Sequence, residues 1–300
     1  MEKELDLRYP NSANLFQFCR RVLDHRFGGA RVIDQDIGQI LGFDPADCSH
    51  WKKGKKNIRS IQAIKAIAFH LGADERLVVD VASGDINEQE AFLEYIGYGQ
   101  FRLESRVIDA AKKEFYRRSA SWDWGKDQDS RSLFDLDLTA IEQTIGGIHE
   151  SLNLTEAPLY IPEIFSLFPS IQGRREEIYK AVSDDLKIPT GDTRPVFRFF
   201  LARSLYAFFV KTERRERLSA LGEAGRAIED VEKNHFAARL LVPSGLLKKE
   251  MSVVDVTRDI VSQLAETFWV SKSLMNRRIK DVIDGTLDSR FAVQGDAVGQ

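Results

Sequence analysis

Cysteine is scarce in this chain, and its scarcity argues against two kinds of stabilisation. The 300 residues contain only two cysteines, Cys19 and Cys48, and these do not form a CxxC pair. Both fall on the apolar faces of expected helices, where a free thiol serves as a small hydrophobic side chain. The sequence therefore predicts neither a disulfide framework nor a cysteine-bound metal, and it favours a reducing compartment, the cytoplasm.

Long hydrophobic runs are also missing. The N-terminal stretch MEKELDLRYP has no apolar core of the signal-peptide type. The most apolar segment, 196–210, is interrupted by Arg198 and Arg203, too soon for a membrane span of about 20 apolar residues. We expect no membrane role, and the length and ordinary composition predict about two soluble domains.

The segment 34–57, DQDIGQILGFDPADCSHWKKGKKN, predicts two helices joined by a tight turn. Ile37 and Leu41 lie at helical spacing, and the following Gly42 is the residue best able to end a helix in a left-handed conformation. Asp44 is a good N-cap, and the proline after it fits the first position of a second helix.

The second helix of this pair has one apolar side and one small, polar side. Cys48 and Trp51 lie three residues apart and are expected to face the core. A helix that enters a DNA major groove, about 12 Å wide, needs short hydrogen-bonding side chains on its outer face. The residues expected there are Ala46, Asp47, Ser49, His50 and Lys53.

The basic residues of the chain concentrate directly after this helix. Between Cys48 and Ala73 there are six basic residues and no acidic one, while the whole chain has a net charge of −3. A lysine run alone is usually a solvated surface, but behind such a helix pair it suits phosphate. We predict phosphate contacts from Lys52, Lys53, Lys55 and Lys56, and base contacts from Ala46, Asp47, Ser49 and His50. Asn57 is a further residue of the predicted DNA-binding surface.

The segment resembles the helix-turn-helix of the Cro/CI or Xre regulator family. The resemblance covers about residues 14–83 and is carried by Ile37, Leu41, Gly42, Phe43, Ser49, Trp51, Gly54 and Asn57. It implies a five-helix domain, here residues 1–85, that binds operator sites in double-stranded DNA as a homodimer. Asp34 stands where the family commonly has glutamine, and Asp47 would be repelled by phosphates unless it accepts from a cytosine amino group.

The rest of the chain predicts a helical connector over 86–150, including a polar loop at 119–131, then a second domain over 151–285 and a flexible tail at 286–300. Helices are expected from Leu136 to Leu152, across the apolar segment after Pro195, from Ile228 to Leu241, and as a pair between Ile260 and Val282. The short run Pro158 to Ile161 is a candidate strand of a small sheet. The expected fold class is mainly α, with an α+β second domain.

The second domain resembles the ImmA/IrrE family of zinc peptidases, which are often encoded beside or fused to Xre-type regulators. The resemblance covers roughly residues 155–285, and its most specific part is Glu232, Asn234, Phe236, Ala237, Ala238 and Leu240 to Pro243. It implies a zincin-like α+β fold with Glu232 at the position of the third metal ligand.

The chemistry of that family needs HExxH, two histidines that hold zinc and a glutamate that activates its water. The alignment places Arg203, Ser204 and Ala207 at these positions, a cation, a hydroxyl and a methyl group that cannot perform those roles. The sequence therefore predicts no enzyme, no metal and no cofactor. The remaining Glu232 is hypothesised to form a buried ion pair with Arg203.

The favoured interpretation is a transcription regulator, acting as a repressor, whose degenerate peptidase-like domain serves dimerisation, sensing of a small-molecule effector or binding of a protein effector. Three alternatives stay open. The first is a zinc peptidase with displaced ligands near Glu232 and His235. The second is an antitoxin or prophage-type repressor that acts through a protein partner. The third adds a second DNA-reading unit at Leu264 to Lys280, which contains Arg277, Arg278 and Lys280.

Overall fold

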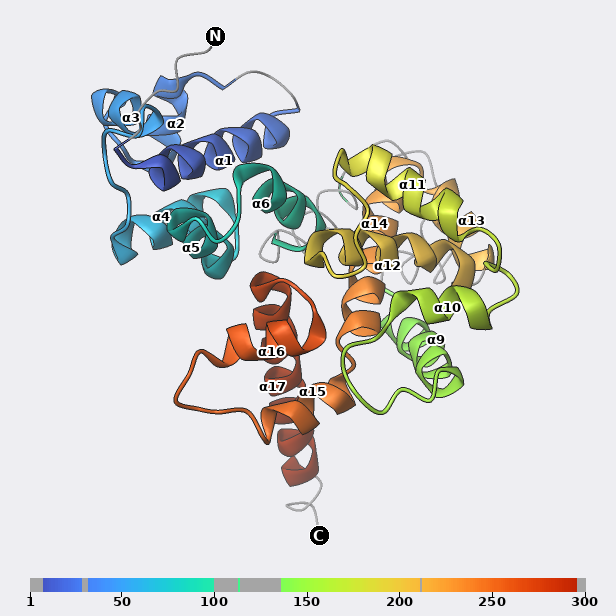
Figure 1. Ribbon diagram of the computed structural model, residues 1–300. Coiled ribbons are helices and arrows are strands. Elements are labelled where there is room, and N and C mark those ends of the chain that lie inside the picture. The colour runs from blue at the N-terminus through green and yellow to red at the C-terminus, as the bar shows by residue number, and fades with distance from the viewer. Residues whose placement is uncertain (1–7, 29–31, 100–112, 114–135, 211, 296–300) are drawn as a thin grey trace. The chain divides into compact units, whose positions relative to one another are not determined.

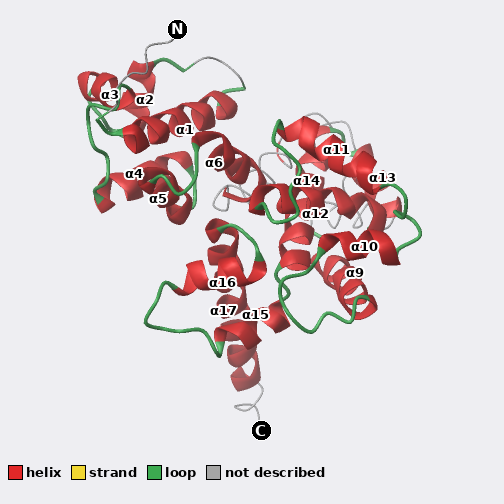
Figure 2. Ribbon diagram, viewed as in Figure 1, coloured by secondary structure: helices red, strands yellow, loops and turns green. Residues whose placement is uncertain are grey.

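The computed structural model of the protein describes residues 8–28, 32–99, 113, 136–210 and 212–295, with the backbone alone for 98, 99 and 285–295. In this part of the chain the fold is mainly α, with fifteen α-helices, one π-helix and no strand (Figure 2). The chain divides into two compact units, Met1–Leu103 and Glu104–Gln300.

Unit 1 is a helical bundle built around its first helix (Figure 1). The first helix, α1, packs against α3, α5 and α6, and its buried face includes Leu15, Phe18 and Val22. The elements are α1 Pro10–Arg26, α2 Asp34–Leu41, α3 Pro45–Lys52, α4 Ile61–Leu71, α5 Glu75–Ser83, α6 Glu88–Glu94 and the π-helix η1 Tyr95–Gly99. The bundle therefore extends past residue 85, the expected end of the first domain.

The predicted helix pair is confirmed at its local signals. Gly42 follows α2 in a left-handed conformation, with φ of 73°, which an L side chain adopts only with strain. Asp44 caps α3 by accepting from the Ala46 backbone N–H at 2.8 Å, and Pro45 is the first residue of the helix. Sequence and structure agree here because caps depend on neighbours only one to three residues away.

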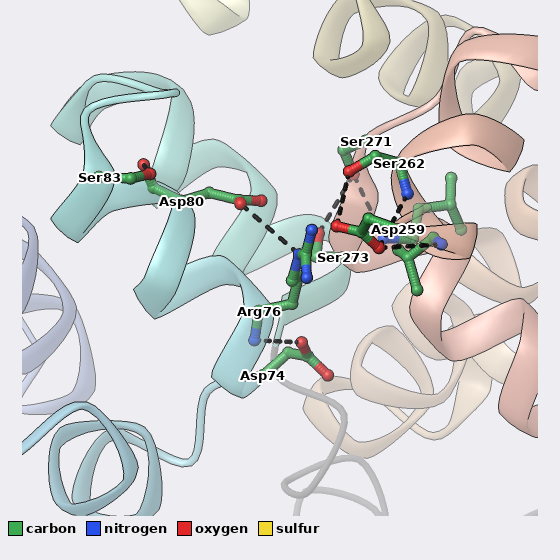
Figure 3. Close-up of polar contacts among 10 residues, drawn as sticks. Asp74, Arg76, Asp80, Ser83, Asp259, Ser262, Ser271 and Ser273 are labelled. Carbon is green, nitrogen blue, oxygen red and sulfur yellow. Dashed lines mark hydrogen bonds and ion pairs between the residues drawn. The ribbon is translucent and has the colours of Figure 1, made fainter. Parts of the chain in front are cut away.

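The next two helices begin in the same way. The Ser60 side chain caps α4, and the Asp74 side chain accepts from the Arg76 N–H at 2.8 Å to cap α5. One turn further, buried Asp80 lies 3.7 Å from the Arg76 Nε, while its backbone carbonyl accepts from Ser83 Oγ (Figure 3). These contacts fix the ends of α5 within unit 1.

Unit 2 is a second helical assembly with two long helices at its centre. Helix α12 packs on α11 and α14, and α14 also contacts α9, α13 and α17. The last pair, α16 and α17, pack on each other, and Asp259 caps α16 through the Val261 and Ser262 N–H groups (Figure 3). The elements are α9 Leu138–Ser151, α10 Ile161–Leu167, α11 Arg175–Leu186, α12 Pro195–Phe209, α13 Thr212–Ala220, α14 Glu223–Leu241, α15 Ser244–Met251, α16 Ile260–Phe268 and α17 Lys272–Gly295.

A fully buried arginine ties three segments of unit 2 together. Arg198 on α12 donates to the backbone carbonyls of Leu159 at 2.8 Å, Asp192 at 3.0 Å and Trp269 at 3.1 Å. Burial lowers its pKa to about 10. The arginine that interrupts the apolar sequence of α12 is thus an internal cross-link, and its charge is shared among carbonyl dipoles.

The expected strand at Pro158 to Ile161 is wrong. Leu159 is buried in a non-regular segment, and its carbonyl accepts from Arg198 and not from a neighbouring strand. Ile161 then opens α10, whose first turn accommodates the proline that follows. No sheet is present in the residues that the structure describes, so the α+β character predicted for the second domain is not observed there.

Two other predicted segments differ in how far the structure describes them. The helix predicted from Leu136 is confirmed as α9, but most of the connector at 86–150, including the loop at 119–131, lies outside the described residues. Helix α17 continues to Gly295 and so includes most of the segment predicted as a tail.

Candidate nucleic-acid interface

Trp51 fixes α3 to the body of unit 1. Its side chain is fully buried, as predicted, and its indole Nε1 donates to the Ser12 carbonyl at 2.6 Å. Its ring meets Phe16 edge-on and Phe43 at a tilt, with centroids 5.1 Å apart in both cases. Cys48, also buried, completes the inner face of the helix. The orientation of α3 is therefore set by apolar packing and one buried hydrogen bond.

The turn between α2 and α3 is tight because Gly38 has no side chain. A Cβ at this position would lie 2.7 Å from the Phe43 carbonyl oxygen and 3.1 Å from Cys48 Sγ. The Phe43 N–H donates to the Gly38 carbonyl at 2.8 Å, so the backbones meet directly. Sequence reasoning passed over Gly38, although an isolated glycine within an apolar helical pattern is a signal of close packing.

We expect Gly38→Ala to destabilise unit 1 by about 1–3 kcal/mol, because the added methyl group forces α2 and α3 apart. Gly146→Ala, in α9, is the matched control, since its Cβ meets nothing within 4 Å. There the gain in helix propensity should stabilise by about 0.5–1 kcal/mol. Denaturant unfolding followed by circular dichroism measures both. Equal effects of the two substitutions would contradict the packing argument.

The outer face of α3 carries the side chains predicted to read bases. Ala46 and His50 are exposed, and Asp47 and Ser49 are partly exposed. Behind them the turn after α3 is held by a hydrogen bond from the Tyr9 N–H to the Gly54 carbonyl at 2.8 Å. Asn57 is exposed, and its Oδ1 lies 3.4 Å from Ser12 Oγ. We call the surface that carries these side chains and the neighbouring lysines the α3 face, and it consists of residues 46, 47, 49, 50, 52, 53 and 55–57.

The lysines of the α3 face fall into two kinds. Lys56 Nζ lies 2.5 Å from Asp47 Oδ2, and Lys52 Nζ lies 3.0 Å from Asp34 Oδ2. Asp34 also pairs with Arg20. Lys53 and Lys55 are exposed and pair with no carboxylate of the described residues. Asp34 and Asp47 are thus each paired with a lysine of the α3 face.

Among the described residues of unit 2, one carboxylate is buried, and it joins four elements. Glu232, on α14, is fully buried. Its Oε1 accepts from the Arg214 Nη2 at 2.6 Å and from the Asp137 N–H at 2.9 Å, and its Oε2 accepts from the Tyr206 hydroxyl at 2.6 Å. Burial, reinforced by the hydrogen bond to this carboxylate, raises the pKa of Tyr206. The carboxylate therefore fixes the start of α9, α12 and α13 to α14.

The hypothesised ion pair between Arg203 and Glu232 is wrong. Arg203 Nη2 lies 2.7 Å from Asp230 Oδ1, at the exposed side of α14, whereas the cation on Glu232 is Arg214. Tyr206, three residues after Arg203, is the α12 side chain that reaches the carboxylate. Arg214 lies within a charged stretch of sequence with no feature that distinguishes it from its neighbours, so nothing in the sequence pointed to it.

Ser204 and Ala207, the other two residues that the sequence alignment places at HExxH, also make local hydrogen bonds. Ser204 Oγ donates to the Leu201 carbonyl at 2.7 Å, and the Ala207 carbonyl accepts from Arg215 Nη1 at 3.1 Å. Beside Glu232, between α9 and α13, there is a cavity of about 440 Å³. Its lining has both charges and apolar side chains: Leu136, Asp137, Ala140, Ile141, Gln143, Thr144, Val210, Glu213, Arg214, Arg217 and Glu232.

The described histidines of unit 2 make protein contacts. Arg239 Nη1 lies 2.5 Å from His235 Nδ1, and His149 Nε2 contacts the Leu240 carbonyl at 3.0 Å. Burial lowers the pKa of His149, which favours its neutral form. No group of three or more histidine, cysteine, aspartate or glutamate side chains with metal-binding geometry occurs among the described residues.

The burial of two arginines argues against the alternative of a second DNA-reading unit at Leu264 to Lys280. Arg277 and Arg278 are buried, and Arg278 donates to the Val242 carbonyl at 3.1 Å and to Ser244 Oγ at 2.9 Å. Its charge also pairs with Asp281 at 3.0 Å. These two arginines are therefore structural, and only Lys280 of the three cations is exposed.

Among the described residues, no helix combines the length and the apolar character that crossing a membrane requires. Comparison of the chain with models of protein families, with curated proteins and with solved structures found no match.

Proposed function

We propose that this protein is a sequence-specific DNA-binding transcription regulator of the cytoplasm, and that it acts as a repressor. The observation that carries the proposal is the α3 face: a helix anchored by buried Trp51 presents small and polar side chains outward, beside two exposed lysines that pair with no carboxylate of the residues that the structure describes. A helix held in this way can enter a major groove without rearranging the domain. The whole chain has a net charge of −3, so affinity for phosphate depends on this local surface.

The two kinds of lysine serve binding differently. Lys53 and Lys55 are available to phosphates at once and supply the sequence-independent part of the affinity. Lys52 and Lys56 are engaged with Asp34 and Asp47 in the free protein. DNA has to compete with these exposed pairs, which are individually weak.

Base discrimination is assigned to Ala46, Asp47, Ser49 and His50. The Asp47 carboxylate is an acceptor only, so in a groove it suits the amino group of cytosine. Its ion pair with Lys56 holds it beside a cation that offsets its repulsion from the backbone phosphates. Asp47 thus selects against sites at which no amino group faces it.

We expect Asp47→Asn to raise affinity for non-specific duplex DNA about fivefold at 0.15 M salt, because it releases Lys56 for one more phosphate contact. The slope of log affinity against log salt should steepen by about one. Glu75→Gln, which makes the same charge change on α5, is the control. Fluorescence anisotropy on a duplex of random sequence measures both. A weaker or unchanged slope would show that Lys56 is not freed for phosphate.

For unit 2 we propose a role without catalysis, in dimerisation, effector sensing or partner binding. Two observations support this role: Glu232 is saturated by Tyr206, Arg214 and the Asp137 backbone, and the cavity beside it is of a size that suits a small ligand. Metal analysis of the purified protein tests the proposal. One tightly held zinc per chain, lost on Glu232→Ala, would favour a peptidase with displaced ligands instead.

Selection of bound fragments from genomic DNA with the purified full-length protein tests the proposed function. The expected product is a palindromic sequence, since two copies reading half-sites about one helical turn apart give the usual specificity. Recovery of random sequence at low salt only, with no shared site, would reduce the α3 face to a non-specific basic patch.

A further inference from the structure

The cavity between α9 and α13 has an apolar interior. Four aliphatic side chains line it: Leu136, Ala140, Ile141 and Val210. Ile141 is 1 % exposed, and Leu136 packs against a small core cluster that includes Leu218 of α13 and Ile228 of α14. An aliphatic group that enters this interior leaves water and contacts other aliphatic groups, which favours its binding.

Two of the three carboxylates that line the cavity are already engaged within the protein. Glu232 is saturated by its buried contacts, including Arg214 at 2.6 Å. The Asp137 carboxylate accepts from the Ala140 N–H at 3.2 Å and so caps α9. The third carboxylate, on Glu213, is exposed at the mouth of the cavity. A ligand therefore meets one carboxylate that is not used by the fold.

Glu213 and Arg217 place two unpaired, opposite charges at this mouth. Both are exposed, and both line the cavity from α13, four residues apart. An acid four residues before a base is the order that stabilises a helix. These two side chains nevertheless form no ion pair, and neither has a charged partner among the described residues. The same spacing does pair on α14, where Lys233 Nζ lies 3.2 Å from Glu229 Oε1.

The lining sets the chemistry of a ligand. The Arg217 guanidinium matches the geometry of a carboxylate, and Glu213 suits an ammonium group. A dicarboxylate would be repelled by Glu213, and a diamine by Arg217. The two residues lie about 6 Å apart along the helix axis, and their long side chains can converge on one small molecule. The volume of about 440 Å³ lies toward the lower end of the roughly 300–1,000 Å³ of small-molecule sites.

We propose that this cavity is a binding site for a free amino acid with an aliphatic side chain. The carboxylate of the ligand binds Arg217, its ammonium group binds Glu213, and its side chain enters the apolar interior. The inference rests on the effector-sensing role proposed for unit 2 and names the chemical class of the effector. Because the ligand contacts both α9 and α13, it stabilises folded unit 2 by mass action.

Calorimetric titration of the full-length protein with L-leucine tests the site. We expect saturable binding of a single L-leucine per chain. Isocaproate lacks the ammonium group and isoamylamine lacks the carboxylate, so each should bind at least about tenfold more weakly. Absence of saturable binding of L-leucine, L-isoleucine and L-valine up to about 10 mM would overturn the proposal. Equal affinity for L-leucine and isocaproate would also overturn it, because the site would then select a carboxylate alone.

Two variants assign the charged groups of the ligand. Arg217→Gln should weaken L-leucine binding at least about tenfold and leave isoamylamine, which has no carboxylate, unchanged. Glu213→Gln should weaken L-leucine binding likewise and leave isocaproate unchanged. Arg226→Gln removes an exposed arginine of α14 that does not line the cavity, and it is the matched control. Equal losses in Arg217→Gln and Arg226→Gln would contradict a carboxylate site at Arg217.

A cavity-filling variant tests the location without changing either charge. Ala140→Leu places a branched side chain in the interior and should abolish L-leucine binding, and leucine is well tolerated within a helix. Ala220→Leu, at the exposed end of α13, is the matched control and should bind like the wild type. Far-UV circular dichroism checks that both variants are folded. Wild-type affinity in folded Ala140→Leu would overturn the proposal.

The outcomes separate this inference from the proposed function. L-leucine binding is measured without DNA, so its absence in a protein that still selects an operator refutes the amino-acid site and leaves the DNA-binding function standing. If L-leucine binds as expected but does not change operator affinity at saturation, the amino-acid site stands and the sensing role of unit 2 fails.

Discussion

Replacing Lys52, Lys53, Lys55 and Lys56 with alanine is expected to abolish nanomolar operator binding. Four lost phosphate contacts lower the slope of log affinity against log salt by about three to four. At 0.15 M salt this corresponds to a loss of about 100- to 1,000-fold, the lower value applying if Asp34 and Asp47 already reduce the contribution of their lysine partners. Anisotropy titrations on the selected palindrome at several salt concentrations measure the affinity and the slope together.

The control makes the same change of charge far from the α3 face in sequence. Lys180, Lys187, Lys248 and Lys249 are exposed lysines of unit 2, and their replacement with alanine also removes four positive charges. If both quadruple variants lose the same affinity and slope, the effect reports net charge alone. If the first variant binds like the wild type, the α3 face does not contact DNA.

Glu232→Ala is expected to have the largest effect on the stability of unit 2. Removal of the carboxylate leaves the Arg214 guanidinium, the Tyr206 hydroxyl and the Asp137 N–H without their acceptor in a buried site. The loss of one partner from a buried ion pair costs about 3–5 kcal/mol. Scanning calorimetry of the full-length protein should show a lower transition temperature for unit 2. DNA binding through the α3 face of unit 1 should persist at about 25 °C, because proteins are close to their maximum stability near that temperature.

Two further variants separate burial from charge. Asp230→Ala removes a carboxylate from the same helix, but its pair with Arg203 is partly exposed, so the loss should be about 0–1 kcal/mol. Combining Glu232→Leu with Arg214→Met removes both charges and should recover part of the lost stability. Equal destabilisation by Asp230→Ala and Glu232→Ala would contradict the assignment of Glu232 as the buried junction.

The features that could be predicted from the sequence are those fixed by a few neighbouring residues. The end of α2 at Gly42, the cap at Asp44 and the inward faces of Cys48 and Trp51 depend on one turn of helix each, and all are confirmed. The surface position of the α3 face follows from the same periodicity. What this surface binds stays a prediction, because exposure and charge define a chemistry and not a partner.

The features that were missed depend on residues far apart in the chain. Glu232 meets Arg214 across 18 residues and the Asp137 N–H across 95, and no local rule ranks Arg214 above Arg203. The expected strand failed for the same reason, since the Leu159 carbonyl is taken by Arg198, 39 residues later. Gly38 is an intermediate case, because its helical context was visible but the approach of Phe43 was not.

The buried Arg198 also bears on the order in which unit 2 can be completed during synthesis. Two of its acceptors, on Leu159 and Asp192, precede it in the chain, but the third, on Trp269, follows 71 residues later. At about 5–20 residues per second, a ribosome needs several seconds to reach it. Until then the guanidinium lacks one acceptor, so a nascent chain that has just made α12 cannot yet close over it. Unit 2 therefore matures only when its C-terminal helices emerge.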